Sequence, residues 1–406
     1  MPPTSTSCFA GALALVFACI GHAGEPLDVR IGLDVRAVAV DSTPSFIEGG
    51  FGRLRFDEQH DGLRLGMAWL DARYRLTETL TLNADVVSYG DGNGATVDVT
   101  ELYLRHRPFP AGPWRWSTRV GAFYPGFSME HRGPAWTPVY TITPSALNAW
   151  YGEELRAIGL ETELRWLGAA SGYQGDVGFV MGVYGWNDPI GVLLAERGWA
   201  PHDRQTGLFG YLPMPGNSQE KIREFRDQDG RPGYYAGVEW NHAEALEVRL
   251  FRYDNRADPG AEEHGVYAWL TKFDALAVRW QPDNHWTLLA QALRGETYIG
   301  PWTTWVKGWD MDAWFVLGSY ELGNWRGSAR YEEFSTAQFR GRRPWNLDDD
   351  GRAFTVSTSW DFARGWQLAA EWLRVESYLA ARSGHGLAPG QTEEQLQLAL
   401  RYQWHW

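Results

Sequence analysis

The sequence predicts an all-β protein: a transmembrane, antiparallel, up-and-down β-barrel of about 16 strands, with short turns at one end and long loops at the other. Three observations predict this fold. Segments of about ten residues alternate apolar and polar side chains along most of the chain. Short polar turns and long Gly- and Pro-rich loops alternate between these segments. Trp or Tyr stands at many segment ends.

The overall composition excludes other classes. The chain has 406 residues, 15% of them aromatic, which argues against disorder. A mean hydropathy of −0.38 is too polar for a bundle of membrane helices. The net charge of −13 argues against wholesale binding to nucleic acid, because phosphate contacts need a basic surface. These totals alone leave a soluble acidic enzyme possible.

The first 23 residues are predicted to be an export signal. Residues 8–21 are uncharged and apolar, and the small residues that follow fit cleavage after Ala23. No Lys or Arg precedes this run, so the usual basic start is missing, and a lipoprotein alternative exists at Cys19. Cys8 and Cys19 both lie in the signal, so residues 24–406 contain no cysteine for disulfides, metal ligation or thiol catalysis.

The two ends of the predicted barrel show the alternation most clearly. Leu27 to Arg36 alternates apolar with polar residues, and so does the C-terminal segment. In that segment one face carries Leu396, Leu398, Leu400, Tyr402, Trp404 and Trp406. Between the ends, further strands begin near Leu63, Leu80, Thr100, Trp114, Leu155, Asp176, Tyr234, Leu246, Thr271, Trp286, Asp312, Trp325, Ala353 and Trp366.

The connections are of two lengths. Short ones lie at 77–79, 108–113, 168–175, 241–245, 281–285, 321–324 and 361–365. Long ones lie at 41–62, 88–98, 125–152, 187–232, 254–267, 296–310, 335–351 and 377–393. No convincing amphipathic helix is found, although 218–226 could form a helical turn. A soluble sandwich would also give alternating strands, but aromatic strand ends and alternating loop lengths favour a membrane barrel.

The sequence resembles Gram-negative outer-membrane porins of the general-diffusion or phosphate-selective kind. The resemblance lies in the C-terminal alternation that ends on Trp406, in the absence of cysteine after the signal, and in the alternation of short turns with long loops. The resemblance implies an outer-membrane location, with short periplasmic turns and long extracellular loops. It also implies that the C-terminal residues are an assembly signal, which the barrel-assembly machinery binds. The other partners that it implies are outer-membrane lipid, small hydrophilic solutes and two further copies of the chain in a homotrimer. In such families the third long loop, here 125–152, often folds inward and narrows the lumen.

The polar faces of the strands and this third loop supply the pore-lining candidates. We expect the lumen or its constriction to be lined by Arg30, Arg36, Glu101, Tyr103, Arg105, Arg119, Glu130, His131, Arg132, Glu153 and Glu154. One hypothesis is that Arg105 and Arg119 oppose acids of the third loop such as Glu130 and set up a transverse field. The alternative is that they form ordinary salt bridges in the barrel wall.

The sequence predicts a passive channel with no cofactor, no metal and no catalytic residue. Gly90 to Gly94 resembles a phosphate loop, but no helix pattern follows, so a loop tip is favoured. Asp348 to Asp350 could hold calcium, although nearby arginines favour self-neutralisation. Two other functions stay open: an outer-membrane hydrolase, for which no GxSxG motif is present, and a plugged barrel that serves as a scaffold or adhesin, with 187–232 covering its mouth.

Overall fold

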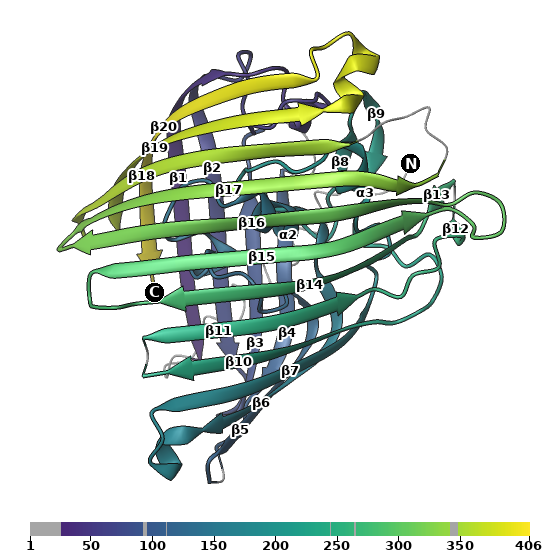
Figure 1. Cartoon of the computed structure of the whole chain (residues 1–406). Helices are drawn as coiled ribbons and strands as arrows, with labels where there is room; N and C mark the ends of the chain where they lie inside the picture. The colour runs from purple at the N-terminus through teal and green to yellow at the C-terminus, as the bar shows by residue number, and fades with distance from the viewer. Residues whose placement is uncertain (1–25, 92–95, 111, 244, 264, 342–347) are drawn as a thin grey trace, which may run out of the picture.

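The computed structural model describes residues 26–91, 96–110, 112–243, 245–263, 265–341 and 348–406, and the predicted signal peptide lies outside them. Sixteen antiparallel strands close into one barrel (Figure 1). The barrel strands, in chain and neighbour order, are β1 (Leu27–Asp41), β2 (Gly62–Arg75), β3 (Leu80–Ser88), β4 (Val97–His106), β5 (Trp114–Phe123), β6 (Ala157–Leu167), β7 (Gly175–Gly185), β10 (Gly233–His242), β11 (Leu246–Asp254), β14 (Trp269–Trp280), β15 (Trp286–Ile299), β16 (Lys307–Leu322), β17 (Trp325–Arg340), β18 (Asp349–Ala363), β19 (Trp366–Leu379) and β20 (Gly390–His405). The predicted all-β fold and strand count are confirmed.

The first and last strands close the barrel. β1 pairs with β20 from Arg30 opposite His405 to Asp41 opposite Glu394. The backbone N–H of Trp406 donates to Val29 at 2.9 Å, and Val29 donates back at 3.0 Å. Closure leaves no strand edge unpaired, as a lipid environment requires. Both ends of the described barrel lie at the end of the molecule that carries the short turns.

The barrel wall is uneven in height. β3 to β11 contain 9–11 residues each, whereas β14 to β20 contain 12–16. On the outward face of the taller wall, apolar side chains are replaced by charged ones part-way along the strands. Ion pairs occupy that face beyond its apolar part, including Arg252–Asp274 at 2.6 Å, Lys272–Glu296 at 2.6 Å and Arg374–Glu394 at 2.7 Å. These charges mark where the apolar band of the exterior ends.

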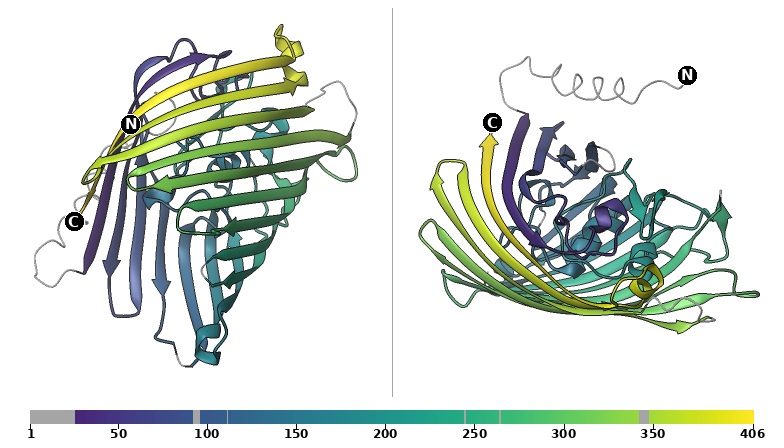
Figure 2. Two further views of the ribbon diagram at one scale, coloured as in Figure 1. Left: turned by 60° about the vertical axis from the view of Figure 1, so that its left-hand side comes forward. Right: turned by 90° about the horizontal axis from the view of Figure 1, so that it is seen from above.

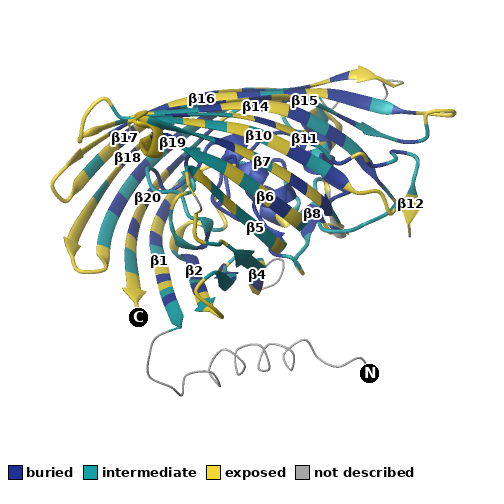
Figure 3. Cartoon of the chain, turned by 90° about the horizontal axis from the view of Figure 1, so that it is seen from below, coloured by how far each residue is buried: buried dark blue, intermediate teal, exposed yellow. Residues whose placement is uncertain are grey.

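The apolar band surrounds the short-turn half of the barrel. Exposed and buried residues alternate along the strands, so that one face of each points outward (Figure 3). Large apolar side chains on the outward face include Val120, Leu160, Phe179, Leu250, Val316, Val356 and Leu398. Aromatic side chains stand on this face at the short-turn end: Trp114, Trp240, Trp280, Trp286, Trp325, Trp360 and Trp366. Such rings settle where hydrocarbon meets water, so the exterior has the pattern of a lipid-facing wall.

A charge introduced into this band should be costly. We expect Val316→Arg, in the middle of β16, to lower the free energy of unfolding by about 2–4 kcal/mol. The matched variant Leu322→Arg, at the strand end, should cost only about 0–1 kcal/mol because its guanidinium reaches water. Denaturant unfolding in phospholipid vesicles, followed by Trp fluorescence, measures both. Equal losses would mean that the band does not face lipid.

Shorter elements lie between the barrel strands. Two hairpins, β8 (Leu212–Met214) with β9 (Asn217–Ile222) and β12 (Glu262–Glu263) with β13 (Val266–Tyr267), belong to long loops. The helical turn expected at 218–226 is wrong, because the Pro215–Gly216 turn, with φ +75° at Gly216, reverses the chain into a hairpin.

Two α-helices were not predicted: α2 (Ala146–Glu154) and α3 (Val192–Glu196). Short 3₁₀ segments occur at η1 (Phe46–Glu48), η2 (Pro134–Trp136), η3 (Gly168–Ser171) and η4 (Ala380–His385). Every residue of α2 is buried, so it has no polar face and shows no amphipathic period for sequence reasoning to detect. No helix among the described residues is long and apolar enough to cross a membrane.

The interior of the barrel is filled on one side. α2 lies within the ring of strands (Figures 1 and 2). The inward faces of the taller wall are buried against it. Those of β14 to β16 carry mainly apolar side chains, such as Phe273, Leu293 and Phe315, whereas those of β17 to β20 also carry many buried polar ones, such as Arg330, Glu371 and Gln397. The expectation that the polar strand faces all line a water-filled lumen is therefore wrong for this wall. Its inward faces pack against protein, and apolar side chains gain from leaving water.

Candidate functional site

The loop between β5 and β6 crosses the barrel interior. It begins at Tyr124, whose backbone N–H donates to Glu101 of β4 at 2.8 Å. Met129 donates its N–H to Gln291 of β15 at 3.0 Å, and Thr143 donates to Glu371 of β19 at 3.0 Å. The segment that the sequence singled out as an inward-folded loop, 125–152, thus reaches the opposite wall through backbone hydrogen bonds to inward strand side chains.

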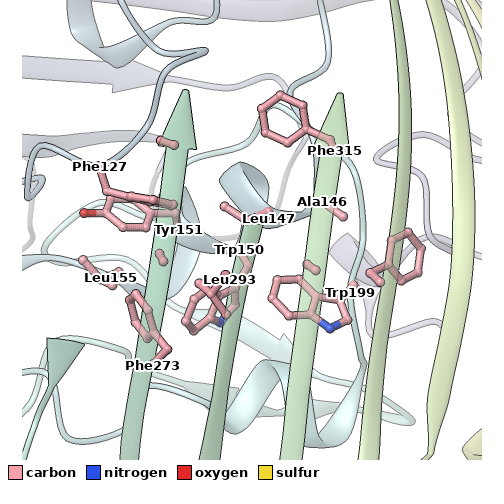
Figure 4. Close-up of a cluster of buried hydrophobic side chains, with 14 of the residues drawn as sticks. Phe127, Ala146, Leu147, Trp150, Tyr151, Leu155, Trp199, Phe273, Leu293 and Phe315 are labelled. Atoms are coloured by element: carbon pink, nitrogen blue, oxygen red, sulfur yellow. The ribbon is translucent and has the colours of Figure 1, made fainter. Parts of the chain in front are cut away.

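The helix α2 forms the apolar centre of this inserted loop. Ser145 caps its N-terminus by accepting the N–H of Asn148, as serine commonly does. Trp150, Tyr151 and Leu147 pack against Trp199 and wall residues such as Phe273, Leu293 and Phe315 (Figure 4). The rings of Trp150 and Trp199 meet edge to face at 5.6 Å. Burying each such side chain stabilises the packing by about 1.5–3 kcal/mol, so the insert is held firmly.

A second loop segment, between β7 and β10, packs beside the first. Arg197 donates to both carboxylate oxygens of Glu153, at 3.0 Å and 2.5 Å. His202 Nε2 lies 2.9 Å from the same carboxylate. Asp203 binds Arg36 of β1 at 2.5 Å and Arg55 of the first long loop at 2.9 Å. This segment therefore joins α2, the first loop and the barrel wall through buried ion pairs.

The pKa values of two neighbouring glutamates of α2, Glu153 and Glu154, are shifted in opposite directions. Burial raises the pKa of Glu154 to about 7, even though it accepts N–H groups from Leu193 and Trp150. Against the same burial, Arg197 and His202 hold the pKa of Glu153 at about 2. The carboxyl of Glu224 lies near Glu154, and burial followed by the charge of Glu154 raises the pKa of Glu224 well above its usual range. Glu154 and Glu224 thus form an acidic pair that resists full ionisation.

Arg330 of β17 is the main polar anchor of the inserted loop. Its side chain is fully buried. It donates to Glu130 at 2.9 Å and to the carbonyl oxygens of Thr143 at 2.8 Å and Pro144 at 3.0 Å. Glu332, on the same strand, lies 3.1 Å from it. A buried guanidinium needs partners for its donors, and here the loop supplies most of them.

A stack of rings forms where the loop turns near the wall. His131 and Trp136 stack at 3.5 Å, Trp136 and Tyr124 at 4.0 Å, and the guanidinium of Arg156 lies 3.4 Å from the Tyr124 ring. Ala135 and Trp136 have φ values of +49° and +54°, which non-glycine residues adopt at a cost. The stacking holds this strained turn in place.

Water reaches the other side of the lumen. Inward charged residues near the short turns are partly exposed, with Arg30 of β1 at 27%, Arg165 of β6 at 21% and Arg249 of β11 at 20% of the side chain. A cavity of about 190 Å³ adjoins the inserted loop where β1, β2, β17, β19 and β20 face it. Residues that line it include Asp34, Trp69, Gln205, Arg326 and Arg401. The accessible interior is therefore a charged vestibule below the inserted loops.

The sequence-predicted lining residues divide into two groups. Arg30, Glu101, Tyr103, Arg105, Arg119, His131 and Arg132 are not fully buried. In contrast, Glu130, Glu153, Glu154 and Arg36 are at most 2% exposed. The packed loops and the wall enclose these four side chains: Glu130, Glu153 and Arg36 are in ion pairs, and Glu154 accepts N–H groups from Leu193 and Trp150. Their part in a constriction stays a prediction.

Arg105 and Arg119 are brought together but do not face Glu130. They lie directly opposite each other across β4 and β5. Arg119 donates to Glu161 at 2.6 Å and 2.9 Å, while Arg105 lies 5.5 Å from the Tyr103 ring. Glu130 instead binds Arg330 on the other side of the interior. Arg119 thus forms the wall salt bridge that was the alternative, and no ion pair joins Arg105 or Arg119 to Glu130.

Several residues that hold the inserted loops were missed. Arg330, Glu332, Gln291 and Asp203 all make such contacts. Arg330, Glu332 and Gln291 stand at inward strand positions, which was the available signal, whereas Asp203 lies in a loop and shows none. Their partners lie far away in sequence, so the pairing itself could not be inferred.

The candidate calcium site at 348–350 has another partner. Asp349 binds the Arg53 guanidinium and accepts the N–H of Trp199 at 2.9 Å, which supports neutralisation by arginine.

Most of the Gly-rich tip around Gly92 lies outside the described residues. The C-terminal assembly residues lie on β20, with Leu396, Leu398 and Leu400 on its outward face, and their role as a signal stays a prediction.

Comparison with solved structures identifies the fold. The chain is similar to an L8-loop-deleted form of OmpT, an outer-membrane protein of Vibrio cholerae, at 12% identity, covering 94% of this chain and 100% of that one with a TM-score of 0.50. It is similar to the outer-membrane channel DcaP of Acinetobacter baumannii, at 11% identity, 93% and 96% coverage and a TM-score of 0.50. It is also similar to an anion-selective porin from Comamonas acidovorans, at 11% identity, 93% and 99% coverage and a TM-score of 0.50.

No protein-family model and no curated protein sequence matches the chain. At these identities the likeness concerns the fold alone: a porin-like, 16-stranded outer-membrane barrel.

Proposed function

We propose that this porin-like barrel is a passive diffusion channel for small hydrophilic solutes or ions in the outer membrane of a Gram-negative bacterium. The observation that carries the proposal is the combination of a closed barrel, an apolar exterior with an aromatic rim, and a charged, partly exposed vestibule inside the same wall. Charges inside a barrel wall stay solvated and can select solutes by charge. Such transport requires no covalent step and no cofactor.

The packed loops favour a channel with a closed resting state. The inserted loop is tied to β15, β17 and β19, and the second segment to β1. In this arrangement we expect low conductance, with larger openings when one loop leaves its site. The same packing also supports the second candidate, a plugged barrel that acts as a scaffold, because α2 is fully buried.

Conductance separates the two candidates. Purified protein in planar bilayers should give discrete conductance steps, and liposomes that contain it should swell in small sugars. Discrete steps and swelling support the channel. Their absence, in preparations that are folded by circular dichroism, would reject the channel in favour of the scaffold. Lipid cleavage during the same assay would reject both and indicate a hydrolase.

We further propose a homotrimer built through the shorter wall. The strands β3 to β7 have only 9–11 residues, and their outward faces are mainly apolar, with residues such as Leu102, Val120, Leu160 and Met181. Chemical cross-linking in native membranes tests this. Trimeric adducts that Leu160→Arg abolishes, while Leu250→Arg on β11 preserves them, would support the interface. Monomers alone would reject it.

A further inference from the structure

A groove of about 750 Å³ lies on the outer face of the taller wall, beyond the apolar band and toward the long loops. It crosses the neighbouring strands β16 to β20 (Figure 1). Most of its lining side chains share the outward strand face with Val316, Val356 and Leu398 of the apolar band. The groove therefore opens to the outside of the barrel and not to the lumen.

One row of side chains crosses all five strands of the groove. The strand register aligns them in this order: Trp314, Glu333, Arg352, Glu376 and Thr392. Neighbouring strands are about 4.8 Å apart, so the row is about 19 Å long. It offers an aromatic ring at one end, a hydroxyl group at the other, and planar charged groups between them.

The next row, toward the long loops, continues the same mixture of groups. It consists of Asp312, Ser335, Asp350, Tyr378 and Gly390. Ser335 and Gly390 are small, so space remains between the larger side chains. Trp314 on β16 and Tyr378 on β19 keep 38% and 40% exposure. Two aromatic rings, three strands apart, are therefore open to a ligand.

The polar side chains of the groove hold one another in place but keep free acceptors. Arg352 donates to one carboxylate oxygen of Glu376 at 2.6 Å and 2.9 Å. The hydroxyl of Tyr331 donates to Glu333 at 2.6 Å. A carboxylate has about four acceptor positions. Each of these carboxylates is thus fixed in orientation and can still accept hydrogen bonds from a ligand.

The lining indicates an uncharged, hydroxyl-rich ligand. Exposed ring faces pack against the apolar face of a sugar, and ionised carboxylates bind hydroxyl groups through short, charge-assisted hydrogen bonds. Four carboxylates and one guanidinium line the groove, which disfavours the phosphate groups of anionic lipids. A cationic ligand gains little, because Arg294, Arg352 and Arg374 already pair with these acids.

We propose that this groove binds uncharged oligosaccharides outside the barrel. The site is independent of the proposed channel function, because these side chains face away from the lumen. Rings and polar groups that follow one another across five strands suit an extended chain of sugar rings better than a compact solute. Both a free glycan and the sugar part of an outer-membrane glycolipid carry this chemistry, and the test separates the two sources.

Binding is measured with maltohexaose, cellohexaose and mannohexaose. Folded protein in lauryldimethylamine oxide, a detergent without a sugar head group, is titrated by calorimetry. At least one hexaose should bind, and Trp314→Ala should weaken that binding about tenfold, as expected for the loss of a stacked aromatic ring. The matched control Trp302→Ala removes a similarly exposed indole outside the groove and should bind like the native chain.

A second pair of variants tests a carboxylate without a change in side-chain volume. Asp350→Asn should weaken binding about fivefold, because a charged acceptor becomes a neutral one. Asp274→Asn, on the same outer face but outside the groove, should leave binding unchanged. Circular dichroism checks that every variant is folded.

The outcomes identify the ligand source and can overturn the site. Binding of a hexaose that Trp314→Ala and Asp350→Asn both weaken supports a free glycan. If only dephosphorylated lipopolysaccharide in phosphatidylcholine vesicles binds, with the same dependence on these variants, the lipid-linked sugar is the ligand. Binding that requires the lipid phosphates, equal binding in Trp314→Ala and Trp302→Ala, or no binding of any probe would overturn the site.

The site and the channel fail separately. Trp314→Ala alters no lumen group, so its conductance should equal that of the native chain. Sugar binding by a native chain that gives no conductance would reject the channel and keep the site. Sugar block of the current that persists in Trp314→Ala and Asp350→Asn, together with unchanged sugar affinity, would place the sugar in the lumen and overturn the site.

Discussion

Replacement of Arg330 by Met is expected to release the inserted loop and raise the single-channel conductance several-fold. Arg330 donates to Glu130 and to two loop carbonyl groups while fully buried. Removing one partner of a buried ion pair costs about 3–5 kcal/mol, because the remaining charge stays buried without compensation. The closed arrangement should lose stability of that order, whereas the strand pairing of β17 is unchanged.

The control is Arg352→Met on β18. That arginine pairs with Glu376 at 2.6 Å on the outer face with 61% of its side chain exposed, so its loss should have little effect on stability. Bilayer recordings give the conductance, and trypsin cleavage after Arg132 reports release of the loop. Glu130→Gln, which keeps most hydrogen bonds, should act in the same direction more weakly. If Arg330→Met and Arg352→Met gave the same conductance and cleavage, Arg330 would not hold the loop.

The second large effect concerns pH. The open fraction of the channel should rise from about pH 4.5 to about pH 7. Burial raises the pKa of Glu154 to about 7 in the packed loop, whereas a solvated glutamate titrates near 4.3. The packed state therefore holds an extra proton in this window, and its stability falls by about 1.4 kcal/mol per pH unit from about pH 4.5 to about pH 7. Above about pH 7 the penalty is constant.

Other groups beside Glu154 act differently. Glu153, with its pKa held at about 2 by Arg197 and His202 against its burial, is ionised throughout the window. The raised pKa of Glu224 acts in the same direction as that of Glu154. Glu154→Gln should thus flatten the pH dependence of the open fraction, while Glu262→Gln, on the exposed β12–β13 hairpin, should leave it unchanged. An unchanged slope in Glu154→Gln would mean that Glu154 does not set the pH dependence.

Most of the barrel could be predicted from the sequence because a strand with one face toward lipid and the other toward the interior alternates apolar and polar side chains. All 16 predicted strands are present, and the short connections separate the expected neighbours. The two termini of the barrel, Leu27 to Arg36 and Leu396 to Trp406, were recognised as strands and pair with each other. Each of these features depends on contacts between residues close in sequence or on the repeated pattern of one wall.

The inner contents of the barrel could not be predicted in the same way. α2 is buried on every face, so it carries no periodic signal. The partner of Glu130 is Arg330, 200 residues away, rather than the arginines that seemed nearer in the strand order. Charged residues at inward positions were correctly placed on the inner wall, but their exposure depends on which loop covers them.

The sequence by itself therefore determined a closed, lipid-facing 16-stranded wall, because in lipid the backbone groups of every strand must pair with those of neighbouring strands, which leaves few alternatives. The tertiary structure decided which part of the interior is dry. Long loops have no repeating pattern, and their positions follow from buried ion pairs and ring contacts between distant segments. That packing changed an expected open lumen into an interior that two inserted loops largely fill, with a cavity of about 190 Å³ beside them.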